Sequence, residues 1–154
     1  MTSRAARFAA VFAGLYAAHH IADHWVQHGA DACDKQQPGR AGRAACGRHV
    51  TTYTITTGLT VTVLDAALNL GLSNRGIAAG QLISAVTHYV VDRGTPLRRI
   101  AAHAGSTDFI ERVTVVRKPG DEPAVVGPGT GAYSLDQSWH TGWLAVAALA
   151  TAIL

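Results

Sequence analysis

The sequence predicts an all-α protein, a four-helix transmembrane bundle with a short interfacial helix and a small β-hairpin in its long loop. Only 15% of the residues are charged, against roughly 25% in soluble domains. The mean hydropathy is +0.14. Four apolar segments approach or reach the length that crosses the ~30 Å hydrocarbon core of a bilayer. The predicted spans are residues 8–28, 49–72, 76–92 and 135–154, joined by polar loops at 29–48 and 93–134. With 154 residues, the chain is most simply one domain.

The first predicted helix combines small residues with a polar end. Ala10, Gly14 and Ala18 recur every four residues, which lets membrane helices approach closely. Its polar end, within HHIADHWVQH, is costly in lipid and must face protein, water or metal. Arginines before an apolar run are typical of a signal peptide, but a small-x-small cleavage site does not follow, which favours a retained segment.

The second and third predicted helices are less typical. The stretch TTYTITTGLTVTV has a strand-like composition, yet threonine hydroxyls can bond the carbonyl one turn back in a helix. Asp65 and Asn69 indicate either a polar contact between helices or the end of the helix. Ser73 and Asn74 can cap the third helix, and Gly94 suits its C-terminus.

The long loop contains two predicted elements. Thr95 as N-cap and Pro96 at the first helical position begin a short helix, PLRRIAAHAG, expected to lie against anionic lipid. Residues 109–117 alternate loosely, turn through 118–121 and resume at 124–126, which predicts a β-hairpin.

A glycine-rich joint precedes the last helix. Residues 127–131 lack the lysine of a phosphate-binding loop and indicate a linker. Ser134 and Gln137 form a predicted capping box, and Trp139 and Trp143 suit a membrane interface.

The distribution of charge predicts the orientation. Ten of the thirteen Lys and Arg residues lie in the two loops, so the positive-inside rule places both loops in the cytoplasm and both termini outside a bacterial inner membrane. Cys33 and Cys46 are then expected as free thiols, although Cys46 and His49 have the spacing of half a zinc site. Nucleic acid is not expected as a partner, because the basic loops lack interleaved aromatic residues.

Histidine and aspartate recur four residues apart in three places. Such pairs lie on one helix face, where an imidazole and a carboxylate can bind one metal ion. In an up-down bundle all three pairs, with His49, reach the cytoplasmic end. The predicted metal ligands are His19, Asp23, His49, His88, Asp92, Asp136 and His140.

These ligand types favour zinc, with manganese or iron as alternatives, and seven of them suffice for one or two ions. Asp23, Asp92 and Asp136 are also the candidate catalytic carboxylates, one of which can act as general base. Gln27 and Gln137 are expected to support the ligands or contact substrate. Arg93, Arg98 and Arg99 are expected to attract an anionic substrate or lipid. Whether His20, His24 and His28 take part is left open.

The motifs resemble a family of small bacterial membrane proteins of unknown function. Its pattern is His-x-x-x-Asp with a following Gln, a later His, a second His-x-x-x-Asp, and Asp-Gln-x-x-His. Here those are His19, Asp23 and Gln27; His49; His88 and Asp92; and Asp136, Gln137 and His140. The stretch GTGAYSLDQSWH resembles the actinobacterial branch in particular. The resemblance implies an integral helical protein similar to predicted membrane-bound metal-dependent hydrolases.

The expected function is therefore metal-dependent hydrolysis of a phosphoester or lipid-derived substrate at the cytoplasmic interface. One alternative is a non-enzymatic membrane scaffold, or an accessory subunit of a larger assembly, whose metal only fixes the helices. Another is a soluble four-helix metalloprotein. Membrane lipid is an expected partner, and a homo-oligomer is compatible with the sequence.

Overall fold

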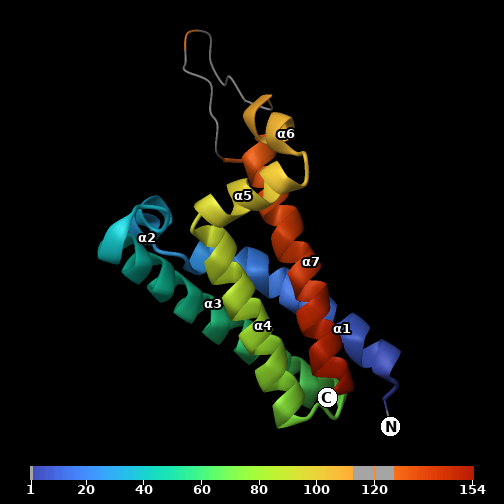
Figure 1. The fold of residues 1–154 in the computed structure, drawn as a ribbon. Helices are drawn as coiled ribbons and strands as arrows, with labels where there is room; N and C mark the ends of the chain where they lie inside the picture. The colour runs from blue at the N-terminus through green and yellow to red at the C-terminus, as the bar shows by residue number, and fades with distance from the viewer. Residues whose placement is uncertain (1, 113–119, 121–126) are drawn as a thin grey trace.

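The protein is a helical bundle, seen in a computed structural model that describes residues 2–112, 120 and 127–154 (Figure 1). The four long helices are α1 (Arg4–Ile21), α3 (Gly39–Leu68), α4 (Asn74–Asp92) and α7 (Gly131–Ile153). Shorter elements are the π-helical turn η1 (Ala22–Val26), α2 (Gly29–Asp34), α5 (Thr95–His103) and α6 (Thr107–Arg112). The predicted all-helical bundle is confirmed.

The long helices run up and down around a small apolar core. α4 packs most extensively on α7, and α1 packs on both α7 and α3. The core contains Val11 and Leu15 of α1, Val61 of α3, and Leu144 and Ala147 of α7. Both termini lie at one end of the bundle, whereas α2, α5 and α6 gather at the other (Figure 1). The C-terminal ends of α1 and α4 therefore meet the N-terminal ends of α3 and α7.

Two helices begin earlier than the sequence predicts. α3 starts at Gly39 rather than at residue 49, because the alanines and the three arginines of residues 39–48 favour helix despite three glycines. α7 starts at Gly131 rather than at residue 135. The side chain of Thr130 caps it by accepting from the N–H of Tyr133, so the predicted capping box at Ser134 is wrong.

The threonine-rich part of α3 behaves as predicted. The hydroxyls of Thr54, Thr56 and Thr60 each donate to the carbonyl four residues earlier, at 2.7–2.9 Å. The helix ends at Asn69, which adopts a left-handed conformation. The carboxylate of Asp65 accepts from the N–H of Leu72 just beyond the helix. Asp65 and Asn69 therefore mark the end of the helix, one of the two predicted alternatives.

A π-helical turn ends the first helix. The N–H of Gln27 donates to the carbonyl of Ala22, five residues earlier, at 2.8 Å. The wider turn takes Gln27 out of the row that a regular helix forms with His19 and Asp23. It also leaves Trp25 86% exposed.

The predicted membrane spans are wrong. Among the described residues, none of the helices combines the length and hydropathy needed to cross a bilayer. Each long helix carries polar side chains at one end, and much of the remainder is alanine, threonine or glycine, which contribute little hydropathy. Large apolar side chains do lie exposed, among them Leu59 on α3 and Leu82 on α4. The predicted inner-membrane location, the cytoplasmic loops and the outward termini lose their basis with the spans.

The two elements predicted in the long loop fare differently. α5 confirms a helix after Gly94, although an interfacial role against lipid falls with the spans. The β-hairpin is wrong in its described part, because Phe109–Arg112 belongs to α6. The remaining hairpin residues, 113–119 and 121–126, lie outside the described residues.

Close contact between α4 and α7 depends on Gly80. A Cβ atom there would lie 2.0 Å from the hydroxyl oxygen of Thr151 and 2.8 Å from the carbonyl oxygen of Ala147. We expect Gly80→Ala to lower the free energy of unfolding by roughly 1–3 kcal/mol because the helices must move apart. The matched control is Gly142→Ala in α7, where a Cβ meets open space. It should raise stability by about 0.5–1 kcal/mol in chemical denaturation. Equal effects of the two changes would contradict this packing argument.

Candidate metal centre

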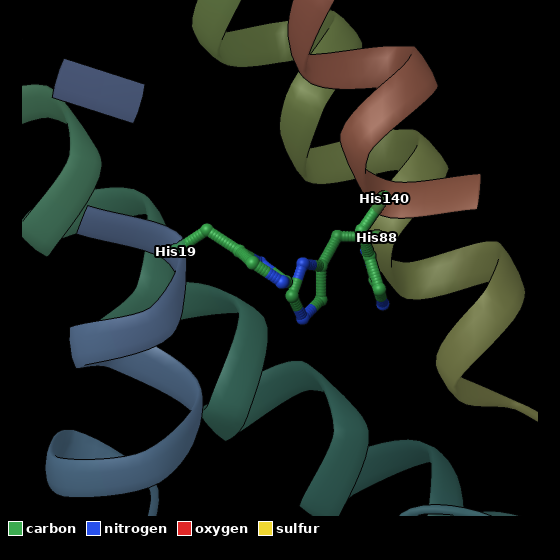
Figure 2. A group of neighbouring side chains, drawn as sticks. All are labelled: His19, His88 and His140. Carbon is green, nitrogen blue, oxygen red and sulfur yellow. The ribbon is translucent and has the colours of Figure 1, made fainter. Parts of the chain in front are cut away.

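Seven polar side chains meet where the four long helices come together. They are His19 and Asp23 from the end of the first helix and its π-helical turn, His49 from α3, His88 and Asp92 from α4, and Asp136 and His140 from α7. Figure 2 shows the imidazoles of His19, His88 and His140 converging from three helices. The structure thus brings together every residue that the sequence predicts as a metal ligand.

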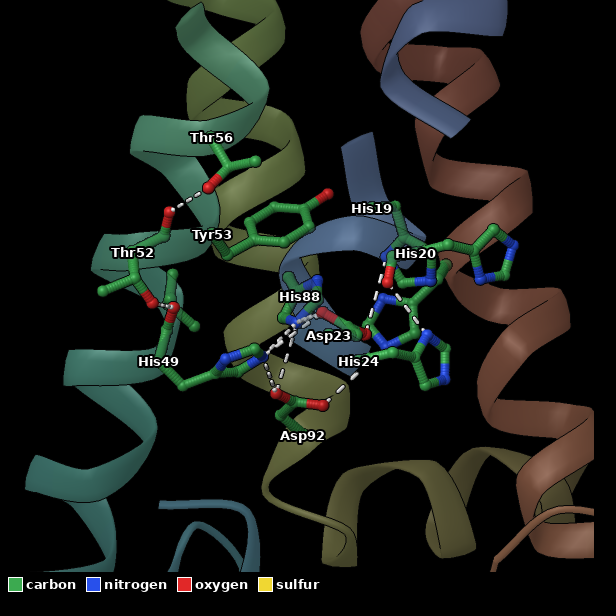
Figure 3. A network of polar contacts seen from close by, with 12 residues as sticks. His19, His20, Asp23, His24, His49, Thr52, Tyr53, Thr56, His88 and Asp92 are labelled. Carbon is green, nitrogen blue, oxygen red and sulfur yellow. Dashed lines mark hydrogen bonds and ion pairs between the residues drawn. The ribbon is translucent and has the colours of Figure 1, made fainter. Parts of the chain in front are cut away.

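Four of these residues have the spacing of a metal-binding set. The Nε2 atoms of His49 and His88 lie 2.9 Å apart, and the Oδ2 atom of Asp92 is 3.2 and 3.3 Å from them. The Oδ1 atom of Asp23 lies 3.5 and 3.6 Å from the same two nitrogens (Figure 3). Tetrahedral zinc ligands, with bonds of about 2.0–2.1 Å, are about 3.3 Å apart. The five distances, 2.9–3.6 Å, lie on both sides of that value, and Asp23, His49 and His88 form a group whose ligand atoms could hold one ion.

A second set shares Asp92. Its other oxygen, Oδ1, lies 3.7 Å from Nε2 of His140, and Oδ2 of Asp136 lies 3.6 Å from that nitrogen. Nε2 of His19 is 3.3 Å from the side-chain oxygen of Gln137, whose amide also donates to Asp136. Gln137 therefore lies beside the ligands, as predicted.

Several buried atoms of the cluster have no hydrogen-bond partner among the described residues. They are Nδ1 of His19, His49 and His88, Nε2 of His140, and Oδ1 of Asp23. Buried polar atoms are ordinarily paired because leaving one unpaired costs about 1–3 kcal/mol. Two of these atoms, Oδ1 of Asp23 and Nε2 of His140, lie 3.5–3.7 Å from other candidate ligand atoms. A cation bound between them would satisfy both.

Burial sets the charge state of the imidazoles. It lowers the pKa of His19 to about 4 and also lowers that of His88, so both are neutral and available as ligands at neutral pH. Burial alone would raise the pKa of Asp92, but the three surrounding imidazoles favour its charged form and hold the pKa well below its usual value. The pKa of Asp136 is raised by burial. Burial opposes the charging of His140, yet the nearby carboxylates raise its pKa.

An aromatic side chain supports the cluster from within the bundle. The ring of Tyr53 packs on His88 with centroids 3.9 Å apart, and its hydroxyl hydrogen-bonds that of Ser84 at 2.7 Å. Tyr53 lies one turn after His49 on the same face of α3. Its ring therefore helps to position the imidazole of His88 on α4. The pKa of Tyr53 is raised by burial, so it remains a neutral phenol.

A pocket of about 370 Å³ opens beside the cluster. Asp23, Asp92 and Asp136 line it, together with Lys35 and Arg98. Nζ of Lys35 lies 3.0 Å from Oδ2 of Asp92. With its amide oriented to suit its neighbours, Gln27 donates to the carbonyl of Asp23 and accepts from Lys35, both at 3.2 Å. Gln27 therefore also supports the site.

Other predicted residues have different environments. The guanidinium of Arg93 donates to the backbone carbonyls of Lys35 and Gln37, so it braces the α2–α3 connection. Arg99 is exposed, and the lining of the pocket does not include it. Cys46 is a buried free thiol whose Sγ faces the carbonyl of Tyr89 at 3.7 Å.

His20, His24 and His28 lie outside the cluster of seven. Nδ1 of His24 lies 2.9 Å from the carbonyl oxygen of His20, and His28 caps α2 by accepting from the N–H of Ala30. His24 still lines the pocket.

Sequence reasoning missed Lys35, Tyr53 and Ser84. The spacing of four between His49 and Tyr53 places both on one face and carries the only trace of this arrangement. For Lys35 no spacing pattern exists, because α2 and a turn separate it from the helices that carry the cluster.

Comparison of the chain with protein-family models, curated proteins and solved structures gave no match. The resemblance to a family of membrane proteins therefore stays a prediction from motifs.

The low pKa of His19 predicts a loss of stability in acid for chelator-treated protein. In the unfolded chain His19 titrates near 6.5, and in the folded protein near 4. As the pH falls, the unfolded state binds the proton first. The free energy of unfolding therefore does not depend on the titration of His19 above about pH 6.5, and it falls as the pH decreases from about 6.5 to 4. The whole shift corresponds to about 3 kcal/mol in the free energy of unfolding.

Chemical denaturation across this range measures the effect. His19→Gln should remove the contribution of His19, about 3 kcal/mol, and leave that of the buried His88, whereas the exposed His24→Gln should retain the whole pH dependence. A His19→Gln protein with the same slope as the original would contradict the assignment.

Proposed function

We propose that the protein binds a divalent transition-metal ion, zinc most readily, and hydrolyses a phosphoester with it. The observation that carries this proposal is the set of five ligand-atom distances, 2.9–3.6 Å, among Asp23, His49, His88 and Asp92. These residues come from three separate elements, so local helix geometry alone does not produce the match. Asp92, Asp136 and His140 form the second set, which allows one or two ions.

The chain provides a rigid, largely buried environment for the metal centre. A bound divalent ion lowers the pKa of water and stabilises charge on phosphoryl oxygens. His49 and His88 are fixed by the bundle and by Tyr53, so little reorganisation accompanies the reaction. The pocket beside Asp92 and Asp136 admits the substrate.

Asp136 is the residue best placed as general base. Its side chain is 25% exposed and lines the pocket, whereas Asp92 is enclosed by imidazoles. A carboxylate whose pKa is raised by burial is a stronger base than an ordinary one. In hydrolysis the water oxygen bonds to phosphorus while its proton passes to Asp136. The bond from phosphorus to the alcohol oxygen then breaks, and that oxygen takes a proton from solvent, to which Asp136 releases the proton it accepted.

A structural metal site in a non-enzymatic scaffold is the second candidate. It is favoured by the number of candidate ligands around His49 and His88, since structural zinc is enclosed by four protein ligands and catalytic zinc by three.

Metal content tests the proposed centre directly. We expect purified protein to retain one or two equivalents of zinc in elemental analysis after extensive dialysis. His88→Ala should lower the metal content by at least one equivalent, because His88 lies within 3.6 Å of the ligand atoms of Asp23, His49 and Asp92. His24→Ala, with its exposed imidazole, is the matched control and should retain the metal. An unchanged metal content in the folded His88→Ala protein would contradict the ligand assignment.

Asp136→Asn separates the enzyme from the scaffold. We expect the variant to fold and to retain at least one equivalent of metal, with hydrolysis of a 4-nitrophenyl phosphoester reduced roughly 100-fold or more. Asp34→Asn, an exposed change on α2, should hydrolyse it normally. Absence of hydrolysis in every metal-loaded form, or loss of the fold in Asp136→Asn, would favour the scaffold.

A further inference from the structure

We propose that the pocket beside the cluster is a phosphoryl-binding site in which Lys35 and Arg98 hold the phosphate end of a small ester. The ion pair between Lys35 and Asp92 links this site to the metal centre, so that metal and anion bind cooperatively. The inference rests on the proposed function and names the groups that recognise its substrate.

The pocket has the size and walls of a small-molecule site. Its volume, about 370 Å³, lies within the usual range for such sites. Carboxylates of the cluster line one part, and the apolar residues Leu97 and Ile110 line another. Both apolar side chains are at least 92% buried, so this wall is fixed by the packing of α5 and α6. A phosphoryl group beside the cluster would leave a short apolar substituent against this wall.

The charges of the lining make anion binding depend on metal. Lys35 and Arg98 supply two positive charges, against the three carboxylates of Asp23, Asp92 and Asp136. This excess of negative charge repels a phosphate. A divalent ion held by the carboxylates reverses the sign, and the two cations then face a phosphoryl group with a net positive wall.

Lys35 is the link between the two sites. Its side chain is only 15% exposed, and its Nζ atom lies 3.0 Å from Oδ2 of Asp92. That oxygen also faces His49 and His88 at 3.2 and 3.3 Å, so it belongs to the four-residue set. A metal ion and an ammonium group therefore compete for one carboxylate oxygen. Metal binding weakens the hold on Lys35, which already lines the pocket and can pair with the incoming anion.

Arg98 supplies the second cation from a separate element. It lies on α5, whereas Lys35 follows α2, so the two charges approach the pocket from different parts of the chain. Arg99, the next residue on α5, carries the same charge and is exposed, yet it is not part of the described pocket lining. The pair Arg98 and Arg99 therefore offers a matched test.

The experiment measures zinc affinity and phosphate affinity in the same set of full-length variants. Zinc affinity comes from competition with a chelator, and phosphate affinity from calorimetry on zinc-loaded protein freed of excess metal. We expect Lys35→Gln and Arg98→Gln to weaken phosphate binding roughly 10- to 100-fold, as expected for loss of a charge-assisted hydrogen bond. Arg99→Gln should stay within about twofold of the original protein. Phenylphosphonate, which has no ester bond to hydrolyse, should bind more tightly than inorganic phosphate because its ring meets the apolar wall.

The link through Asp92 has a signature of its own. Lys35→Gln should bind zinc about tenfold more tightly while it binds phosphate more weakly, because the competing ammonium is gone. Lys35→Arg, which keeps the charge, should retain most of the phosphate affinity. Chelator-treated protein should bind phosphate at least about tenfold more weakly than zinc-loaded protein. Arg98 is exposed, so its replacement leaves the fold intact and tests the pocket even if a change at Lys35 unfolds the chain.

Three results would overturn the inference. They are equal phosphate affinity in Arg98→Gln and Arg99→Gln, unchanged or weaker zinc binding in folded Lys35→Gln, and equal phosphate binding with and without zinc. Each leaves the proposed metal centre in place if zinc is taken up stoichiometrically. Failure of the original protein to retain zinc would instead defeat the proposed function, and the phosphoryl site with it.

Discussion

The buried carboxylate of Asp92 is the charge around which this end of the bundle is arranged. A carboxylate removed from water needs compensating partners, and here they come from His49 on α3, His88 one turn earlier on α4, His140 on α7 and Lys35 after α2. Removing any one partner leaves the charge of the Asp92 carboxylate less completely compensated. The helices are therefore held in register by the same group that a metal ion would bind.

The remainder of the bundle fixes the positions of these partners. The close approach of α4 and α7 at Gly80 and Thr151 sets where His88 and His140 lie relative to each other. One turn further along the same face of α4, Ser84 hydrogen-bonds Tyr53 in the interior and holds α3 against it. The positions of the imidazoles thus depend on small residues two or more turns away and on a buried phenol that packs on His88, rather than on the cluster alone.

Sequence spacing predicted the helical class and the gathering of the seven polar residues, because residues four apart lie on the same face of a helix. It failed where the decisive contact is tertiary. Hydropathy alone suggested membrane spans, since alanine-rich helices with exposed Leu59 and Leu82 resemble them in composition. The start of α7 depends on Thr130, which a glycine-rich stretch conceals. Lys35 reaches Asp92 across 57 residues, and local pattern contains no information on such a pair.

The π-helical turn after α1 has an optical consequence. By turning the chain outward after Asp23, it leaves the indole of Trp25 in water, immediately after a residue that lines the pocket. Indole emission responds to the polarity and charge of its surroundings. Trp25 therefore gives the entrance a built-in fluorophore, and replacing Trp139 and Trp143 with phenylalanine would isolate its signal from the other two tryptophans of the chain.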